Sequence, residues 1–123
     1  MKAALLVFLG GGLGSVFRYF LGLKLNNLES GIPYGTFLAN ILGSLMIGIF
    51  FGYLTKYGTL NENHTLFIAT GFCGGFTTFS TFAYENHLFF KANDYFTMLP
   101  YLILTFAVGI SAVFFGIYLA KLM

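Results

Sequence analysis

The chain has 123 residues, of which 58% are hydrophobic and only 8% are charged. A soluble domain normally carries about 25% charged residues, so this composition excludes a water-soluble globular protein and indicates an integral membrane protein. The net charge of +2 leaves no basic surface for nucleic acid, and the one cysteine, Cys73, excludes both an intramolecular disulfide and a CxxC metal motif.

Four apolar stretches are each long enough for a membrane-spanning helix, which needs about 20 residues. Short connections that contain Asn, Gly or Pro separate these stretches. The sequence therefore predicts an all-α integral membrane protein in which residues 1–123 form a single transmembrane domain. The predicted spans cover residues 4–25, 35–55, 65–90 and 97–120.

The first span contains a glycine-rich segment and a charge. The glycines of GGGLGS (10–15) lack the following lysine and the preceding strand of a phosphate-binding loop, so they predict close helix packing. Arg18 lies inside the apolar run, near its end. Such a residue either extends to the membrane surface or faces a partner or an aqueous cavity. In either case we interpret Arg18 as a structural charge.

The second span contains an amide side chain, Asn40, within GTFLANILGS (35–44), and Thr36 precedes it by one helical turn. A buried amide costs several kcal/mol in hydrocarbon unless it is paired. Asn40 is therefore expected either to make a hydrogen bond between helices or to line a pore.

The third span is the longest and contains the segment GFCGGFTTFSTFAYE (71–85). Gly74-Gly75 tolerates a break in the helix, and the Ser and Thr side chains can cap the broken ends. Broken helices at membrane depth line cavities or are buried in protein, and their free carbonyls bind ions in transporters. We therefore predict a break within Gly74–Thr78, and we expect Glu85 either in a buried site or at the edge of a vestibule.

Phe76, Phe79 and Phe82 follow one another at i, i+3 and i+6, so on a helix they would fall on roughly one face. A phenylalanine ring has a negative face and a positive edge. Edges directed into a narrow pore would stabilise a small anion without a full charge, and hydroxyl donors would replace its water. A phenylalanine stripe can also simply pack helices, but the interleaved hydroxyls favour the pore.

The basic residues are almost evenly divided between the two sides of the membrane. Since their imbalance sets the orientation, the near balance predicts either one orientation that wins by a small margin or dual topology with antiparallel pairs. A homodimer would also supply walls for the polar groups, and closed two-fold dimers are the commonest oligomers. The side with both termini carries Lys2, Lys56 and Lys121, and the other carries Lys24 and Lys91, with Arg18 near it.

Four kinds of function are open to a membrane protein of this size. The sequence has no carboxylate pair, nucleophile–base pair or metal-ligand spacing, so an enzyme is not expected. A small dual-topology exporter of drugs or cations would need an acid in the first span, where the chain has Arg18 instead. A structural subunit would explain the hydrophobicity but not the alternation of hydroxyls and aromatic rings. A passive channel for a small anion explains both.

Three motifs resemble the CrcB/Fluc family of microbial fluoride channels: GGGLGSVFRY (10–19), PYGTFLANILGS (33–44) and above all GFCGGFTTFSTFAYE (71–85). The likeness covers nearly the whole chain, including its length and four-span layout. It implies a dual-topology homodimer in the inner (plasma) membrane, with two antiparallel pores that passively export fluoride from the cytoplasm. It also implies a structural sodium ion at the dimer axis.

The resemblance further implies roles for individual residues. Phe79 and Phe82 look like the pore phenylalanines, and Asn40 looks like the pore-facing amide. The backbone carbonyls of Gly74 and Thr77 look like the sodium ligands, two from each subunit. The polar positions expected near the permeation path are Thr36, Thr81, Glu85, Tyr101, Thr105 and Ser111. The chain departs from the family at Ala107 and Gly109, where relatives often carry serine, so its polar track has fewer hydroxyls.

Overall fold

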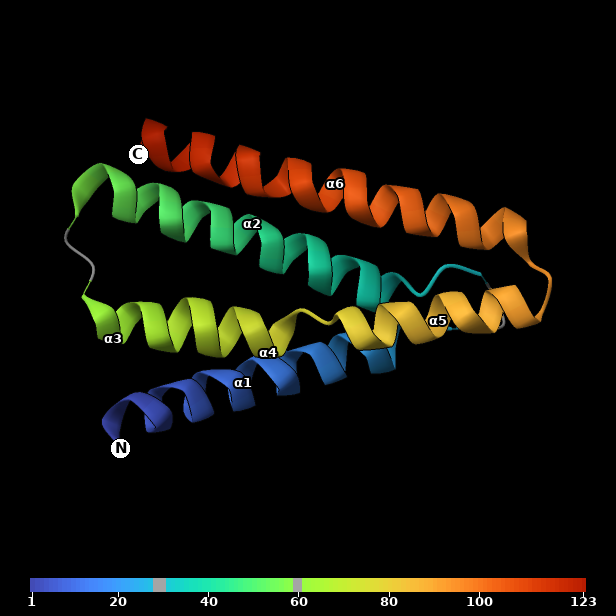
Figure 1. Cartoon of the computed structure of the whole chain (residues 1–123), viewed down its shortest axis with the longest axis horizontal. Coiled ribbons are helices and arrows are strands. Elements are labelled where there is room, and N and C mark those ends of the chain that lie inside the picture. Colours follow the sequence, from blue (N-terminus) through green and yellow to red (C-terminus); the bar gives the residue numbers. More distant parts are fainter. Residues whose placement is uncertain (28–30, 59–60) are drawn as a thin grey trace.

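The computed structural model describes residues 1–27, 31–58 and 61–123, and the regular elements within these ranges are helices (Figure 1). The third span is built from four consecutive helical segments, of which η1 is a π-helix. In chain order the elements are α1 (Lys2–Leu25), α2 (Tyr34–Tyr57), α3 (Glu62–His64), η1 (Thr65–Cys73), α4 (Gly74–Phe76), α5 (Phe79–Lys91) and α6 (Tyr95–Leu122).

By length and composition, four helical stretches of the described residues are able to cross a membrane. Each contains one predicted span and extends slightly beyond it, so the prediction of an all-α membrane protein with four spans is confirmed. Both chain ends lie near the end of α2 and the start of α3, at one end of the molecule, whereas α5 turns into α6 at the other (Figure 1). The four stretches are Lys2–Leu25, Tyr34–Tyr57, Glu62–Lys91 and Tyr95–Leu122.

The helices pack as two close pairs, α2 with α6 and α1 with η1 and α4. Glycines allow the backbones of α1 and η1 to approach. A Cβ on Gly10 would overlap the carbonyl oxygen of Phe67, and one on Gly14 would overlap that of Phe72. Small residues serve this purpose widely in membrane bundles. The packing role predicted for residues 10–15 is therefore confirmed for Gly10 and Gly14, whereas Gly12 faces open space.

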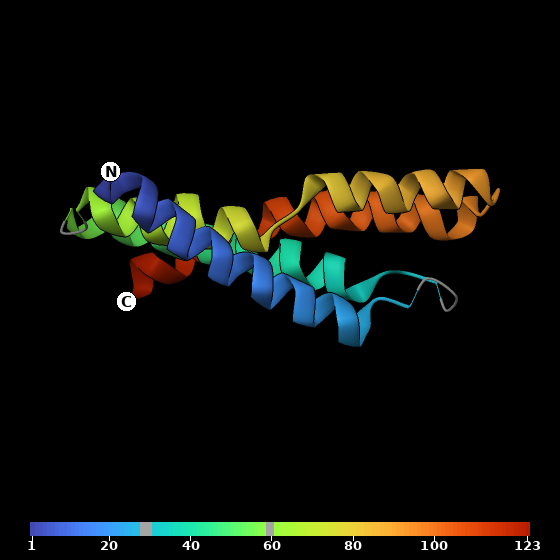
Figure 2. The same cartoon turned by 90° about the horizontal axis from the view of Figure 1, so that it is seen from below.

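The third span is broken at Thr77 and Thr78, whose backbones are extended (φ −79°, ψ 156° and φ −152°, ψ 120°). Figure 2 shows the chain stepping sideways here before α5 begins. The predicted break is confirmed, but it follows the two glycines, which remain helical in α4. Gly75 instead serves packing, because a Cβ there would overlap the carbonyl oxygen of Gly11 in α1.

The break separates the three phenylalanines that a continuous helix would align. Phe76 is buried and stacks on Phe72, with ring centroids 5.7 Å apart. Beyond the break, Phe79 is 72% exposed and Phe82 only 5%. The prediction of one shared face is therefore wrong for Phe76, since two extended residues turn α5 away from α4. Phe79 and Phe82 remain neighbours, with ring centroids 6.1 Å apart.

Candidate functional site

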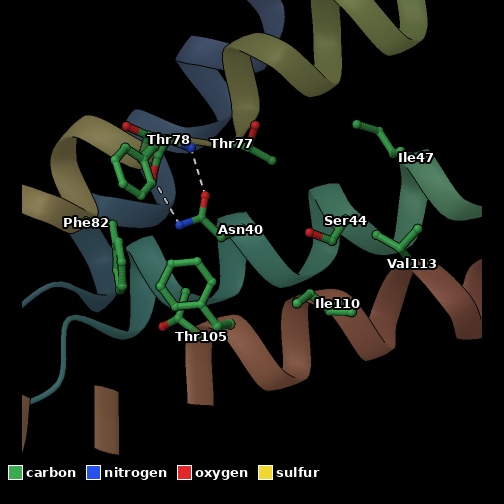
Figure 3. A pocket seen from close by; sticks show the side chains of 12 residues that line it. Asn40, Ser44, Ile47, Thr77, Thr78, Phe82, Thr105, Ile110 and Val113 are labelled. Carbon is green, nitrogen blue, oxygen red and sulfur yellow. Dashed lines mark hydrogen bonds between the residues drawn. The ribbon is translucent and has the colours of Figure 1, made fainter. Parts of the chain in front are cut away.

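Two cavities lie beside the break. The first, which we call the break cavity, has a volume of about 330 Å³ and lies between α2, the break, α5 and α6 (Figure 3). The second, which we call the arginine cavity, has a volume of about 350 Å³ and lies between the C-terminal part of α1, α2 and the start of α5. The polar and aromatic residues of the break cavity include Asn40, Thr77, Thr78, Phe79, Phe82 and Thr105. The arginine cavity is lined by Arg18, Asn26, Thr36, Thr78 and Thr81, among others.

Asn40 connects α2 to the break through two hydrogen bonds. The Thr78 backbone N–H donates to Asn40 Oδ1 at 2.7 Å, and Asn40 Nδ2 donates to the Thr78 carbonyl at 3.1 Å (Figure 3). The amide thus replaces the helical partner that the N–H of Thr78, the N-cap of α5, lacks. The interhelical hydrogen bond expected for Asn40 is therefore present, and its side chain also lines the break cavity. An amide nitrogen carries two protons, so Nδ2 has one beyond its bond to Thr78.

The hydroxyl groups that stood out in the sequence serve the two ends of the break. Thr78 is the N-cap of α5, and its Oγ1 accepts from the Thr81 N–H at 3.3 Å. The Thr78 hydroxyl donates to Thr81 Oγ1 at 3.1 Å. On the other side of the break, Thr77 Oγ1 donates to the Cys73 carbonyl at 2.8 Å. Thr78 therefore satisfies a backbone N–H that the start of α5 leaves without a helical partner, whereas Thr77 adds a second bond to a carbonyl that already accepts the Thr77 N–H at 2.9 Å.

Arg18 has an interior partner rather than extending to the membrane surface. Its Nε donates to the Gly75 carbonyl at 3.0 Å, and Ser15 Oγ reaches the same oxygen at 3.4 Å. In a continuous helix the Phe79 N–H would donate to that carbonyl. Phe79 instead begins a new helix, α5, so the Arg18 side chain is able to bond to the carbonyl. Arg18 therefore faces a partner inside the bundle, and it also lines the arginine cavity.

Glu85 lies in a buried polar network. Thr36 Oγ1 donates to Glu85 Oε1 and the Tyr101 hydroxyl donates to Oε2, both at 2.7 Å. Only 5% of Glu85 and 2% of Thr36 are exposed, and Tyr101 is fully buried. Of the two expectations for Glu85, the buried group is therefore correct. Asn26 completes the network: Nδ2 donates to Thr36 Oγ1 at 3.0 Å and Oδ1 accepts from the Thr36 N–H at 3.1 Å.

Asn26 is the member of this network that the sequence does not point to, because an asparagine in a short connection between two spans indicates only a turn. The signal for its role is weak: an asparagine stands directly after the last residue of a spanning helix, where its side chain can reach the start of the next span.

Thr105 and Ser111, the two other polar residues expected in the fourth span, lie in different surroundings. Thr105 lines the break cavity, but its hydroxyl donates to the Tyr101 carbonyl at 2.6 Å. Ser111 is exposed and is not among the described residues that line either cavity. Ser111 follows Thr105 by six positions, so its side chain is rotated by about 240° around the axis of α6 relative to that of Thr105. Of the two departures, Gly109 lines the break cavity and Ala107 is exposed.

The residues at the break fit the expected cation ligands. In a continuous helix the Gly74 and Thr77 carbonyls would accept from the N–H groups of Thr78 and Thr81. Those donors instead go to Asn40 Oδ1 and Thr78 Oγ1. Within the described ranges, no group of three or more His, Cys, Asp or Glu side chains is placed to hold a metal. A set of neutral carbonyls suits a monovalent cation better than calcium, which recruits carboxylates.

Comparison with known proteins identifies the family. Residues 5–117 match the family described as CrcB-like protein, Camphor Resistance (CrcB). The chain is 48% identical over 122 residues to the "Fluoride-specific ion channel FluC" of Gloeothece citriformis and 42% identical to that of Flavobacterium psychrophilum, covering 98% of this chain and of each relative. It is 40% identical to the protein of the same name from Leptospira interrogans, covering 98% of this chain and 95% of that one. The resemblance of the three motifs is thereby confirmed, and the chain belongs to the CrcB/Fluc family of fluoride ion channels, which are not enzymes.

Proposed function

We propose that this protein is a fluoride-selective channel that passively exports fluoride from the cytoplasm and so lowers fluoride toxicity. The names of its relatives support the ion. The observation that carries the mechanism is the break cavity, in which Phe79, Phe82 and Asn40 meet at the interruption of a membrane helix.

The break cavity is suited to an anion that has to enter it and then leave it again during conduction. The residues that line it are uncharged, so an ion entering it meets only weak, distributed stabilisation. The positive edges of Phe79 and Phe82 and the second Nδ2 proton of Asn40 supply that stabilisation. Conduction requires binding that permits entry without trapping the ion. Arg18 in the arginine cavity adds a positive field that raises the local anion concentration.

Passive export follows from the chemistry of hydrogen fluoride. The neutral acid crosses the bilayer, dissociates in the less acidic cytoplasm and leaves an anion that does not return through lipid. A selective pore in the inner (plasma) membrane lets the membrane potential expel this anion. We therefore propose that location for this multi-pass protein.

An antiparallel homodimer with a sodium ion on its axis is part of the proposal. Phe79 lines the break cavity yet is 72% exposed in one chain, so a second copy is needed to close the wall around it. Gly74 is also exposed, and the donors of the Gly74 and Thr77 carbonyls are diverted. Two copies would bring four carbonyls to the sodium. Thermal unfolding of the purified protein in sodium and in an organic-cation salt tests this, and equal stability in both would contradict it.

The transport proposal is tested with liposomes that contain the purified protein and are loaded with potassium fluoride or potassium chloride. Valinomycin carries potassium out, and an ion-selective electrode records the anion that follows. We expect fast fluoride efflux and little chloride efflux. Asn40→Asp should abolish fluoride efflux, because it puts an oxygen against the Thr78 carbonyl and a negative charge in the path. Failure of the folded parent protein to release fluoride, or equal release of chloride, would refute the proposal.

A further inference from the structure

Asn26 makes two hydrogen bonds to Thr36, and together they fix which of its amide atoms is which. The Thr36 backbone N–H can only donate, so the amide atom 3.1 Å from it is the oxygen, Oδ1. The other amide atom is therefore the nitrogen, Nδ2, which lies 3.0 Å from Thr36 Oγ1 and must donate to it. The backbone N–H of Asn26 also bonds to the Gly22 carbonyl at 2.9 Å, so the end of α1 holds this side chain in place.

This assignment fixes the direction of the Thr36 hydroxyl proton. The hydroxyl oxygen accepts from Asn26, and its single proton points to Glu85 Oε1 at 2.7 Å. The Tyr101 hydroxyl donates to the second carboxylate oxygen, Glu85 Oε2, also at 2.7 Å. The chain of donors therefore runs from Asn26 through Thr36 to Glu85, and from Tyr101 to Glu85.

The network lies directly behind the wall of the arginine cavity. Asn26, Thr36 and Arg18 line this cavity, whereas Glu85 is not among the described residues that line it and is only 5% exposed. The hydroxyl of Thr36 thus stands between the cavity and the carboxylate. If the Glu85 carboxylate lost these hydrogen bonds and lined the arginine cavity, its negative charge would oppose the field of Arg18 and repel an entering anion.

We propose that Asn26 is a positioning residue of the channel, which turns the Thr36 hydroxyl onto Glu85 and so keeps the carboxylate bound behind the wall of the arginine cavity. Asn26 acts through Thr36 and does not itself need to touch the permeating ion. The inference rests on the proposed fluoride transport only for its effect on rate, because the hydrogen bonds to Glu85 can be observed directly.

Two variants remove the directing bond in different ways. Asn26→Asp keeps the acceptor for the Thr36 N–H but replaces the amide donor with an oxygen that competes for the Thr36 proton. Asn26→Leu removes both bonds without adding charge, and it serves if the aspartate variant does not fold. Asn93→Asp is the matched control, because it makes the same charge change in the exposed turn between α5 and α6.

The direct readout is the infrared carboxylate band of Glu85 in the purified full-length chain with ¹³C-labelled glutamate. This band is identified as the one that Glu85→Gln removes. We expect both Asn26 variants to shift it, because a carboxylate stretch responds to the loss or reorientation of its donors, and Asn93→Asp to leave it unchanged. An unshifted band in folded Asn26→Asp and Asn26→Leu would overturn the inference.

The second readout is fluoride efflux from liposomes, which we expect to fall about tenfold or more in Asn26→Asp. This is the size of effect expected when the Thr36 hydroxyl no longer donates to the charged Glu85 carboxylate. Efflux from Asn93→Asp should stay close to that of the parent. A shifted band with parental efflux would overturn the role of Asn26 in transport. If the parent protein releases no fluoride, the proposed function fails, and the infrared result alone decides whether Asn26 positions Glu85.

Discussion

Asn40 contributes both to the wall of the break cavity and to the backbone of the break. Its side chain lines the break cavity, and by accepting the Thr78 N–H it takes away the donor that the Gly74 carbonyl would have in a continuous helix. One amide therefore links the wall of the proposed pore to a proposed cation ligand. A substitution at Asn40 is expected to disturb both, so its effect on transport by itself does not separate the two roles.

Phe82 offers a cleaner test at the residue scale. It is buried, with its ring centroid 5.1 Å from that of Tyr101 and 5.8 Å from that of Phe106. Phe82→Ile keeps a large apolar side chain but removes the ring quadrupole. We expect a stability loss of about 1–3 kcal/mol with the fold preserved, and a much larger proportional fall in fluoride efflux from liposomes.

Phe67→Ile is the control for this substitution, because Phe67 lies in η1 and is not among the described residues that line either cavity. Its efflux should stay near the parental rate. Parental efflux from folded Phe82→Ile would mean that the ring of Phe82 only packs the helices.

At the scale of elements, the contact between α1 and the third span depends on where glycines lie along α1. A Cβ at Gly14 would overlap the Phe72 carbonyl oxygen and crowd the Phe76 backbone nitrogen, whereas a Cβ at Gly12 would meet nothing within 4 Å. Backbone atoms cannot move aside as a flexible side chain can. The position of η1 and α4 against α1 therefore depends on Gly14 and not on Gly12.

Gly14→Ala and Gly12→Ala form a matched pair that tests this packing. We expect Gly14→Ala to destabilise the protein by about 1–3 kcal/mol or more through overpacking. Gly12→Ala should be neutral, or stabilising by up to about 1 kcal/mol, because alanine favours the helix. Thermal unfolding of both variants in detergent decides the matter, and equal midpoints would count against the close approach of the two backbones.

At the scale of the whole molecule, much of the surface of one chain is apolar. Large hydrophobic side chains are exposed along α1 and α6, such as Phe8, Phe17, Phe106 and Phe114. Lipid accepts such a surface, but the exposed Phe79 and Gly74 at the break need a protein neighbour if they serve an aqueous path. An antiparallel second copy would supply one.

The orientation of the copies is the corresponding test. Because the basic residues are nearly balanced across the membrane, we expect both orientations in one population. A tag at Met123 should be accessible to an impermeant reagent in about half of the molecules from each side of the membrane. A tag that is accessible from one side only would exclude dual topology.

The sequence by itself determined the class of the protein, the four spans, the existence of the break and the family. These depend on local properties: the length of an apolar run, a pair of glycines beside hydroxyl residues, and motifs that are contiguous in the chain. Asn40 and Phe82 were found in the same way, and the structure brings both to the break cavity.

Only the tertiary structure decided which groups meet. Arg18 bonds to Gly75, and Asn26 to Thr36, because α1 packs beside α4 and ends beside the start of α2. The break follows Gly75 rather than occurring at it, and that glycine lies where α4 touches α1. Hydrogen-bond partners and backbone contacts between helices depend on how the helices approach and rotate about their axes. Residue type and local spacing do not specify that geometry.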